Sequence, residues 1–176
     1  MNIHLVTGGA RSGKSTYAEQ MADRLGGENV LYIATAEPGD AEMRERIAAH
    51  RERRSQHWQT IEMYRAAGSA LTAHARAYNL LDCLTLLTAN AYLSCGTHGE
   101  SHHAVQAEVD ALLAAASTLP GELIVVTNEI GMGVVPDTPI GRGYRDSLGW
   151  ANQQVASAAS SVTLLISGVP LVIKSV

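Results

Sequence analysis

The chain has 176 residues, of which 46% are hydrophobic and 17% charged, so we expect one globular domain spanning residues 1–176. The net charge of −4 argues against nucleic-acid binding, and no apolar stretch is long enough to span a membrane. The spacing of Cys83 and Cys95 fits neither a disulfide framework nor a metal site, which predicts free thiols in a reducing, cytoplasmic setting.

The first predicted element is a buried strand at residues 3–7, followed by G-G-A-R-S-G-K-S and a helix at residues 15–25. This octapeptide fits the phosphate-loop template G-x-x-x-x-G-K-[ST], whose backbone amides surround the phosphates of a nucleotide. Its residues are predicted nucleotide contacts: Gly8, Gly9, Ala10, Arg11, Ser12, Gly13, Lys14 and Ser15. Lys14 is expected to reach the β- and γ-phosphates, and the Ser15 hydroxyl to bind Mg²⁺. The alternative, a glycine-rich turn that happens to contain lysine, is disfavoured because every template position is filled.

A second strand at residues 30–34 precedes a helix predicted from Asp40 to Arg54, which contains R-E-R-I-A-A-H-R-E-R-R. Arg46, His50 and Arg54 are four residues apart and therefore lie on one face of this helix. Two guanidinium groups disfavour protonation of His50, and a neutral imidazole can attack phosphorus. The alternative is a solvated basic helix surface, which is the usual explanation of such a run of charges.

Strands and helices alternate through the rest of the chain. Helices are predicted near residues 68–77, 85–94, 104–117 and 145–160, loops at 96–103 and 131–143, and strands at 79–83, 123–127, 162–167 and 171–174. Apolar strands separated by helices predict an α/β fold with a mostly parallel central sheet covered by helices on both faces. The last two strands are close enough to form a C-terminal antiparallel hairpin.

Polar side chains follow several of these strands, at the edge where ligands bind in such sheets. Asp82 is typical of an acid that holds Mg²⁺, although capping of the helix that starts near Thr85 explains it too. Glu129 fits a general base that acts on a substrate hydroxyl, and a structural role fits equally well.

Several sequence blocks, in order from about Val6 to Lys174, resemble one enzyme family. They are G-G-A-R-S-G-K-S, Y-I-A-T-A, E-M-R-E-R-I-A-A-H-R-E-R-R, H-W-Q-T-I-E, L-L-D-C-L-T-L, V-T-N-E-I-G-M-G-V-V-P and G-R-G-Y-R-D-S-L-G-W-A-N-Q. Together they resemble the bifunctional adenosylcobinamide kinase / adenosylcobinamide-phosphate guanylyltransferases of cobalamin biosynthesis. The resemblance implies a RecA-like P-loop NTPase fold and a homotrimer.

The resemblance also implies two reactions. The first phosphorylates the aminopropanol hydroxyl of adenosylcobinamide with ATP or GTP. In the second, a histidine takes GMP from GTP and passes it to adenosylcobinamide phosphate, which gives adenosylcobinamide-GDP. The family histidine lies in an R-I-x-x-H pattern, which here assigns His50 as the nucleophile.

By the same resemblance, further guanine-nucleotide contacts are expected from Ala34, Thr35, Ala36, Arg51, Glu52, Arg53, Arg54, Glu62 and Asp82. Two other functions remain open: a single-activity kinase acting on another small hydroxyl compound, and a nucleotide-dependent switch without transfer chemistry. Leu87 stands where many relatives carry Trp, and this difference is expected to alter how the corrin substrate packs. Tyr144 replaces the usual Phe.

Overall fold

The computed structural model describes residues 2–175, so Met1 and Val176, the ends of the predicted domain, lie outside it. Its elements are β1 (Ile3–Gly8), α1 (Lys14–Gly26), β2 (Val30–Ala34), α2 (Ala41–Arg53), β3 (Gln59–Glu62), α3 (Ala67–His74), β4 (Tyr78–Asp82), α4 (Leu84–Leu93), α5 (His98–Ser117), β5 (Glu122–Val126), α6 (Pro139–Ala158), β6 (Ser161–Ile166) and β7 (Val169–Ser175). Strands and helices alternate along most of the chain, as predicted.

All seven strands form one sheet in the order β3-β2-β4-β5-β1-β6-β7. Every neighbouring pair is parallel except β6 and β7, which form an antiparallel hairpin at one edge. The prediction of a mostly parallel sheet with a C-terminal hairpin is therefore confirmed. Strand β5 lies between β1 and β4, so the segments that follow these three strands emerge side by side.

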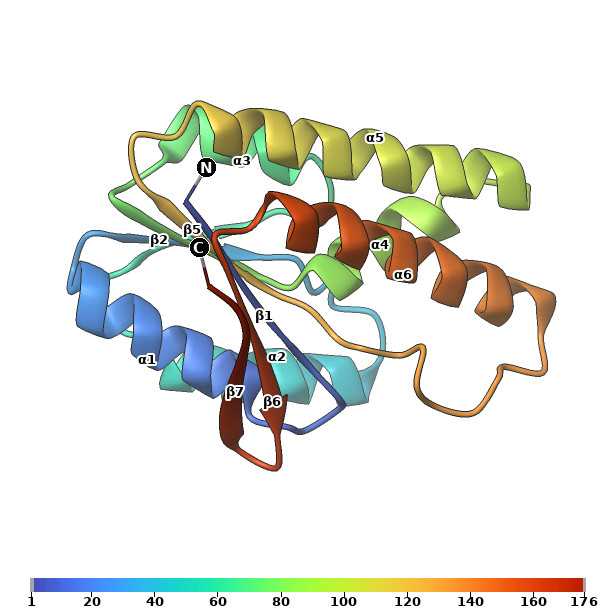
Figure 1. Ribbon diagram of the computed structural model, residues 1–176, viewed down its shortest axis with the longest axis horizontal. Coiled ribbons are helices and arrows are strands. Elements are labelled where there is room, and N and C mark those ends of the chain that lie inside the picture. Colours follow the sequence, from blue (N-terminus) through green and yellow to red (C-terminus); the bar gives the residue numbers. More distant parts are fainter. Residues whose placement is uncertain (1, 176) are drawn as a thin grey trace.

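Helices cover both faces of the sheet (Figure 1). Helices α3, α4, α5 and α6 lie on one face, where their apolar side chains pack against Leu5, Leu81 and Val125. Helix α1 lies on the other face, where Ala18 and Ala22 pack against Val6 and Tyr32. Helix α2 lies on this second face as well, but none of its residues is buried. Among residues 2–175, no single helix has both the length and the apolar character that a membrane crossing requires.

One strand and the starts of two helices differ most from the predictions. Strand β3 was not predicted, because its residues alternate between half-buried and exposed and contain no apolar run. Helix α5 starts at His98, inside the predicted loop, because the Thr97 side chain accepts a hydrogen bond from the backbone of Glu100 and caps it. Helix α6 starts at Pro139, because Thr138 caps it and proline suits a first helical turn.

Candidate active site

The phosphate loop connects β1 to α1 and encloses its own lysine. Lys14 is 7% exposed, and its ammonium group donates a hydrogen bond of 2.6 Å to the carbonyl oxygen of Gly9. Gly13 has a φ of 93°, a conformation that glycine adopts without strain, and the loop turns there into α1. Burial lowers the pKa of Lys14, and the positive charge of Arg46 lowers it further, whereas Cys83 and Asp82 oppose the shift.

The carboxylate of Asp82 stands next to this loop at the end of β4. It accepts a hydrogen bond of 3.3 Å from the Ser15 hydroxyl and one of 2.7 Å from the Tyr32 hydroxyl. It does not cap α4, whose N-cap is Cys83, so the capping alternative is wrong. The hydroxyl and carboxylate oxygens that the sequence assigned to Mg²⁺ therefore lie together, and Mg²⁺ prefers such ligands.

The side chain of His50 extends from α2 towards Asp82. Its Nδ1 atom lies 3.7 Å from Oδ2 of Asp82, and its side chain is 26% exposed. Burial lowers the pKa of His50, with further lowering by Arg53, Arg54 and Arg46, whereas Asp82 acts in the opposite direction. The imidazole is therefore held towards its neutral form, which is the nucleophilic one.

The arginines around His50 differ from the predicted arrangement in one respect. The guanidinium that hydrogen-bonds the imidazole belongs to Arg53, whose Nη2 lies 3.3 Å from Nδ1. Arg54 instead lies over the ring of Tyr32, with its Cζ atom 3.8 Å from the ring centroid. Both side chains nevertheless bring positive charge to the site where the phosphates of a bound nucleotide are expected.

Glu19 completes this cluster and was not predicted. One ligand atom from each of Glu19, His50 and Asp82 lies within 4.8 Å of the others. Within residues 2–175, Oε1 of Glu19 is buried without a hydrogen-bond partner, and burial raises the pKa of this carboxyl. The sequence contains a signal for the position of Glu19, because Ser15 and Glu19 are one turn apart on the helix that follows the phosphate loop.

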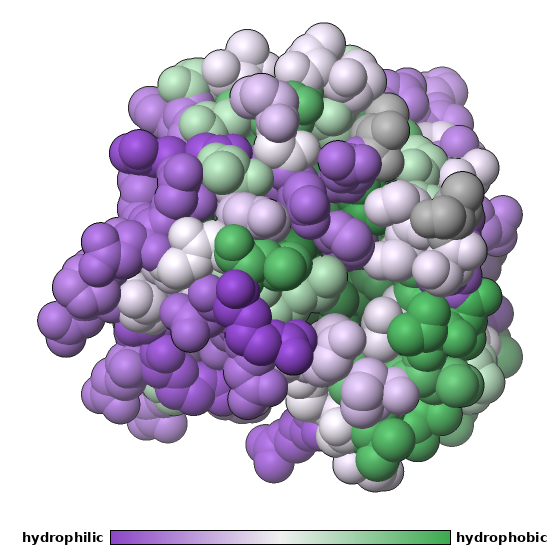
Figure 2. All heavy atoms as spheres, turned by 60° about the vertical axis from the view of Figure 1, so that its left-hand side comes forward, coloured by the Kyte–Doolittle hydropathy of each residue, from purple (hydrophilic) through white to green (hydrophobic). Residues whose placement is uncertain are grey.

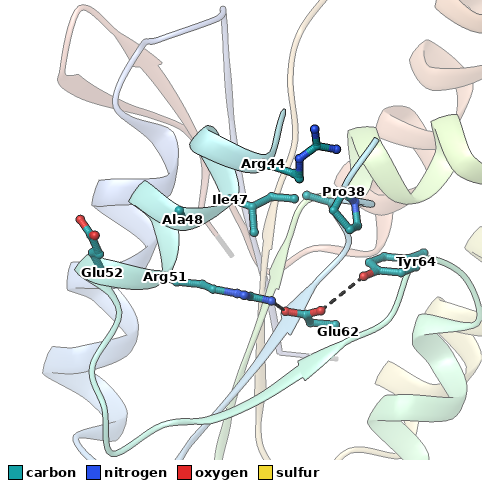
Figure 3. A pocket seen from close by; sticks show the side chains of 9 residues that line it. Pro38, Arg44, Ile47, Ala48, Arg51, Glu52, Glu62 and Tyr64 are labelled. Carbon is teal, nitrogen blue, oxygen red and sulfur yellow. Dashed lines mark hydrogen bonds and ion pairs between the residues drawn. The ribbon is translucent and has the colours of Figure 1, made fainter. Parts of the chain in front are cut away.

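A pocket of about 470 Å³ opens between α2 and the ends of β2 and β3 (Figure 3). Its lining residues are Ala36, Pro38, Arg44, Ile47, Ala48, Arg51, Glu52, Glu62 and Tyr64. Arg51 forms an ion pair with Glu62, which also accepts a hydrogen bond of 3.3 Å from the Tyr64 hydroxyl. The hydrogen bond from Arg51 is the main cause that lowers the pKa of Glu62. Four of these residues were predicted nucleotide contacts: Ala36, Arg51, Glu52 and Glu62.

Two further predicted contacts lie at the end of β2. Ala34 and Thr35 are buried, and the Thr35 hydroxyl both donates to the carbonyl oxygen of Cys83 and accepts from its amide, each at 2.7 Å. Thr35 thus ties the end of β2 to the end of β4, and contacts of these two residues with a nucleotide stay predictions.

The structure shows the surroundings of Leu87 and Tyr144, the two positions that differ from many relatives. Leu87 belongs to α4 and is fully buried in the core, and an effect on how the corrin substrate packs stays a prediction. The Tyr144 hydroxyl donates a hydrogen bond of 2.6 Å to the carbonyl oxygen of Thr85, a bond that phenylalanine does not make.

Sequence comparison identifies a family that matches almost the whole chain. Residues 4–173 match the family described as cobinamide kinase / cobinamide phosphate guanyltransferase. The chain is 43% identical over 172 residues to the bifunctional adenosylcobalamin biosynthesis protein CobP of Pseudomonas aeruginosa, covering 97% of this chain and 96% of that protein. It is 39% identical over 180 residues to the bifunctional adenosylcobalamin biosynthesis protein CobU of Escherichia coli, covering 97% and 98%.

Solved structures with the same architecture are more distant in sequence. The flagellar accessory protein FlaH from Methanocaldococcus jannaschii superposes with a TM-score of 0.51 at 11% identity, covering 99% of this chain and 78% of that one. A second solved structure, an isolated ATPase domain, gives a TM-score of 0.60 at 14% identity, covering 99% and 77%. The predicted RecA-like P-loop fold is thereby confirmed.

Proposed function

The chain belongs to the cobinamide kinase / cobinamide phosphate guanyltransferase family, and from this premise we propose that it catalyses both reactions at the edge of the sheet that carries the phosphate loop. The observation that supports this most strongly is the position of His50, 3.7 Å from an Asp82 that also contacts Ser15 of the phosphate loop. A nucleophile and a triphosphate-binding loop at one edge fit a guanylyltransferase.

In the kinase step, ATP or GTP phosphorylates the aminopropanol hydroxyl of adenosylcobinamide. Lys14 contacts the β- and γ-phosphates, and the arginines of α2 offset the negative charge that develops during transfer. Ser15 and Asp82 are the residues that hold Mg²⁺, which neutralises phosphate charge when it is bound.

In the guanylyl step, a ring nitrogen of His50 bonds to the α-phosphorus of GTP while the bond from that phosphorus to the departing oxygen breaks. Pyrophosphate leaves, and GMP stays attached to His50. A phosphate oxygen of adenosylcobinamide phosphate then attacks the same phosphorus, which yields adenosylcobinamide-GDP and frees His50. Because the pKa of His50 is lowered, the imidazole has a free lone pair near neutral pH.

The pocket beside α2 is the part of the site that suits guanine. The carboxylate of Glu62, held by Arg51 and Tyr64, is an acceptor for the N1–H and 2-amino groups of guanine, two neighbouring donors that adenine does not present. Apolar side chains of Ile47 and Pro38 line the same pocket and fit the faces of a base. We therefore assign guanine recognition to this pocket.

The homotrimer that the family resemblance implies finds support at the edge of the sheet. Hydrophobic side chains gather on one side of the face in Figure 2, and the exposed ones on β7 include Val169, Leu171, Val172 and Ile173. An exposed apolar edge strand is normally covered by another surface, and here a second copy of the chain is the proposed cover. A Leu171→Lys variant that lowers the mass measured by light scattering supports this assignment, and an unchanged trimer or a monomeric wild type contradicts it.

A pulse–chase experiment tests the two-step reaction and separates it from the rival functions. The protein is incubated with α-³²P-labelled GTP alone, freed of nucleotide and then given adenosylcobinamide phosphate. We expect acid-labile label on the protein in the first stage and its transfer to the corrinoid in the second. A single-activity kinase or a nucleotide switch acquires no label in the first stage.

The location of the protein in a reducing cytoplasm stays a prediction. It fits the free thiols of Cys83 and Cys95.

A further inference from the structure

Two sequence blocks, V-T-N-E-I-G and W-A-N-Q, have no role in the reactions described so far. The first follows β5, which lies between the strand of the phosphate loop and the strand of Asp82. The backbone amide of Glu129 donates a hydrogen bond of 3.0 Å to the carbonyl oxygen of Gly8, the first residue of the phosphate loop. Glu129 is therefore anchored beside the loop that holds the transferable phosphate.

A network of buried and half-buried polar side chains fixes the two residues before Glu129. The Thr127 hydroxyl donates to Oδ1 of Asn152 at 2.7 Å, and Nδ2 of Asn152 donates to the carbonyl oxygen of Asn128 at 3.0 Å. The amide of Asn128 donates to the Thr85 hydroxyl at 2.7 Å. Residues next to and within helices α4 and α6 thus both hold the backbone that precedes Glu129, which explains the asparagine of the second block and places Glu129 on a rigid support.

The carboxylate of Glu129 is itself held in place. Its Oε1 accepts a hydrogen bond of 2.6 Å from the backbone amide of Gly131. A Cβ atom at position 131 would lie 2.9 Å from this oxygen, so a larger residue there would displace the carboxylate from its present position. None of the ion pairs within residues 2–175 includes Glu129, so its carboxylate keeps lone pairs for a proton.

We propose that Glu129 is the catalytic base of the kinase reaction, an inference that rests on the proposed function. A carboxylate oxygen of Glu129 accepts the proton of the acceptor hydroxyl as the hydroxyl oxygen bonds to the γ-phosphorus. The bond between the γ-phosphorus and the β–γ bridging oxygen breaks, and the nucleoside diphosphate leaves. Glu129 then releases the proton to water. The guanylyl step involves no hydroxyl proton, so it does not need this residue.

The test compares Glu129→Gln with Asp137→Asn, which removes a carboxylate from the same exposed loop at a position without a role in the site. Two reactions are measured for each protein: phosphorylation of adenosylcobinamide by ATP, and labelling of the protein by GTP alone. For Glu129→Gln we expect kcat of the kinase to fall about 100-fold or more, the usual contribution of a general base, while KM for ATP and the labelling stay unchanged. Asp137→Asn should match the wild type in both reactions.

Each other outcome overturns the inference. A Glu129→Gln variant that keeps its kinase rate within a few-fold shows that the carboxylate takes no proton. Loss of both reactions together assigns Glu129 a structural role, and an equal loss in Asp137→Asn shows a general effect of loop charge. Failure of the proposed function looks different, because the wild-type protein then acquires no label from GTP.

Discussion

The Nδ1 atom of His50 and Oδ2 of Asp82 lie 3.7 Å apart, although one residue belongs to α2 and the other ends β4. Asp82 in turn accepts a hydrogen bond from Ser15, so the proposed nucleophile is two contacts away from the phosphate loop. We therefore expect a triphosphate bound by Lys14 to lie close to the imidazole. This arrangement allows one nucleotide-binding loop to serve both phosphoryl and guanylyl transfer.

Lys14→Ala should impair both reactions, because each requires the triphosphate to be held by this ammonium group. We expect kcat/KM to fall about 100-fold or more for the kinase and for labelling by GTP, as when a group that stabilises transferred charge is removed. Arg24→Ala, at the exposed far end of the same helix, is the matched control and should leave both rates intact. Undiminished binding of GTP by Lys14→Ala would count against this assignment.

The rate of guanylylation should depend on pH in a way that Arg53 controls. Because the pKa of His50 is lowered, the imidazole stays neutral, and the rate stays high, at pH values somewhat below the ordinary histidine value of about 6.5. Arg53→Ala removes a positive neighbour, which raises this pKa and moves the acidic fall of the rate to higher pH. Stopped-flow or quench measurements from pH 5 to 8 would show the displacement. An unchanged profile shape, whatever its height, would contradict the electrostatic argument.

Glu62→Gln should weaken the use of GTP selectively. The amide presents one acceptor oxygen and a donor where the carboxylate presents two acceptors, and a hydrogen bond to a charged group contributes about 1.5–3 kcal/mol. We expect KM for GTP in self-labelling to rise about tenfold or more, with little change in KM for ATP in the kinase reaction. Glu45→Gln, on an exposed position of α2, serves as control. Equal effects on both nucleotides would place guanine elsewhere.

Two glycine substitutions should change the stability in opposite directions. A Cβ atom at Gly68 would lie 2.5 Å from the carbonyl oxygen of Ala111 and 3.1 Å from the amide of Leu112, so Gly68→Ala forces α3 away from α5. We expect the free energy of unfolding to fall by about 1–3 kcal/mol. At Gly99, near the start of α5, a Cβ atom would point into open space, and Ala should stabilise the helix by up to about 1 kcal/mol. Urea denaturation of the two variants measures both values, and destabilisation by both would refute the packing argument.

The parts of the fold predicted from the sequence are those with strong local signals. The phosphate loop and the buried strands carry such signals, because backbone curvature and burial on both faces dictate residue type. Strand β3 carries none, since its four residues pair with only one neighbour and are half exposed. The starts of α5 and α6 depend on the single capping residues Thr97 and Thr138, which composition does not distinguish from loop residues.

For the site, spacing alone indicated His50 as a candidate, and the family resemblance made it the expected nucleophile. The contact of His50 with Asp82 depends on how α2 lies over the sheet, which helical periodicity cannot predict. The contribution of Glu19 depends on the same packing, because the residue gains its role only when His50 and Asp82 come within 4.8 Å of it. Tyr64 likewise joins the site through the turn that follows the unpredicted β3.

Mass spectrometry of the protein after exposure to GTP alone tests most directly whether His50 is the residue that carries GMP. We predict one acid-labile guanylyl group per chain, located by peptide mapping on His50, which is absent from His50→Ala and retained by His57→Ala. A protein that acquires no adduct, or carries it on another residue while His50→Ala labels normally, would contradict the account.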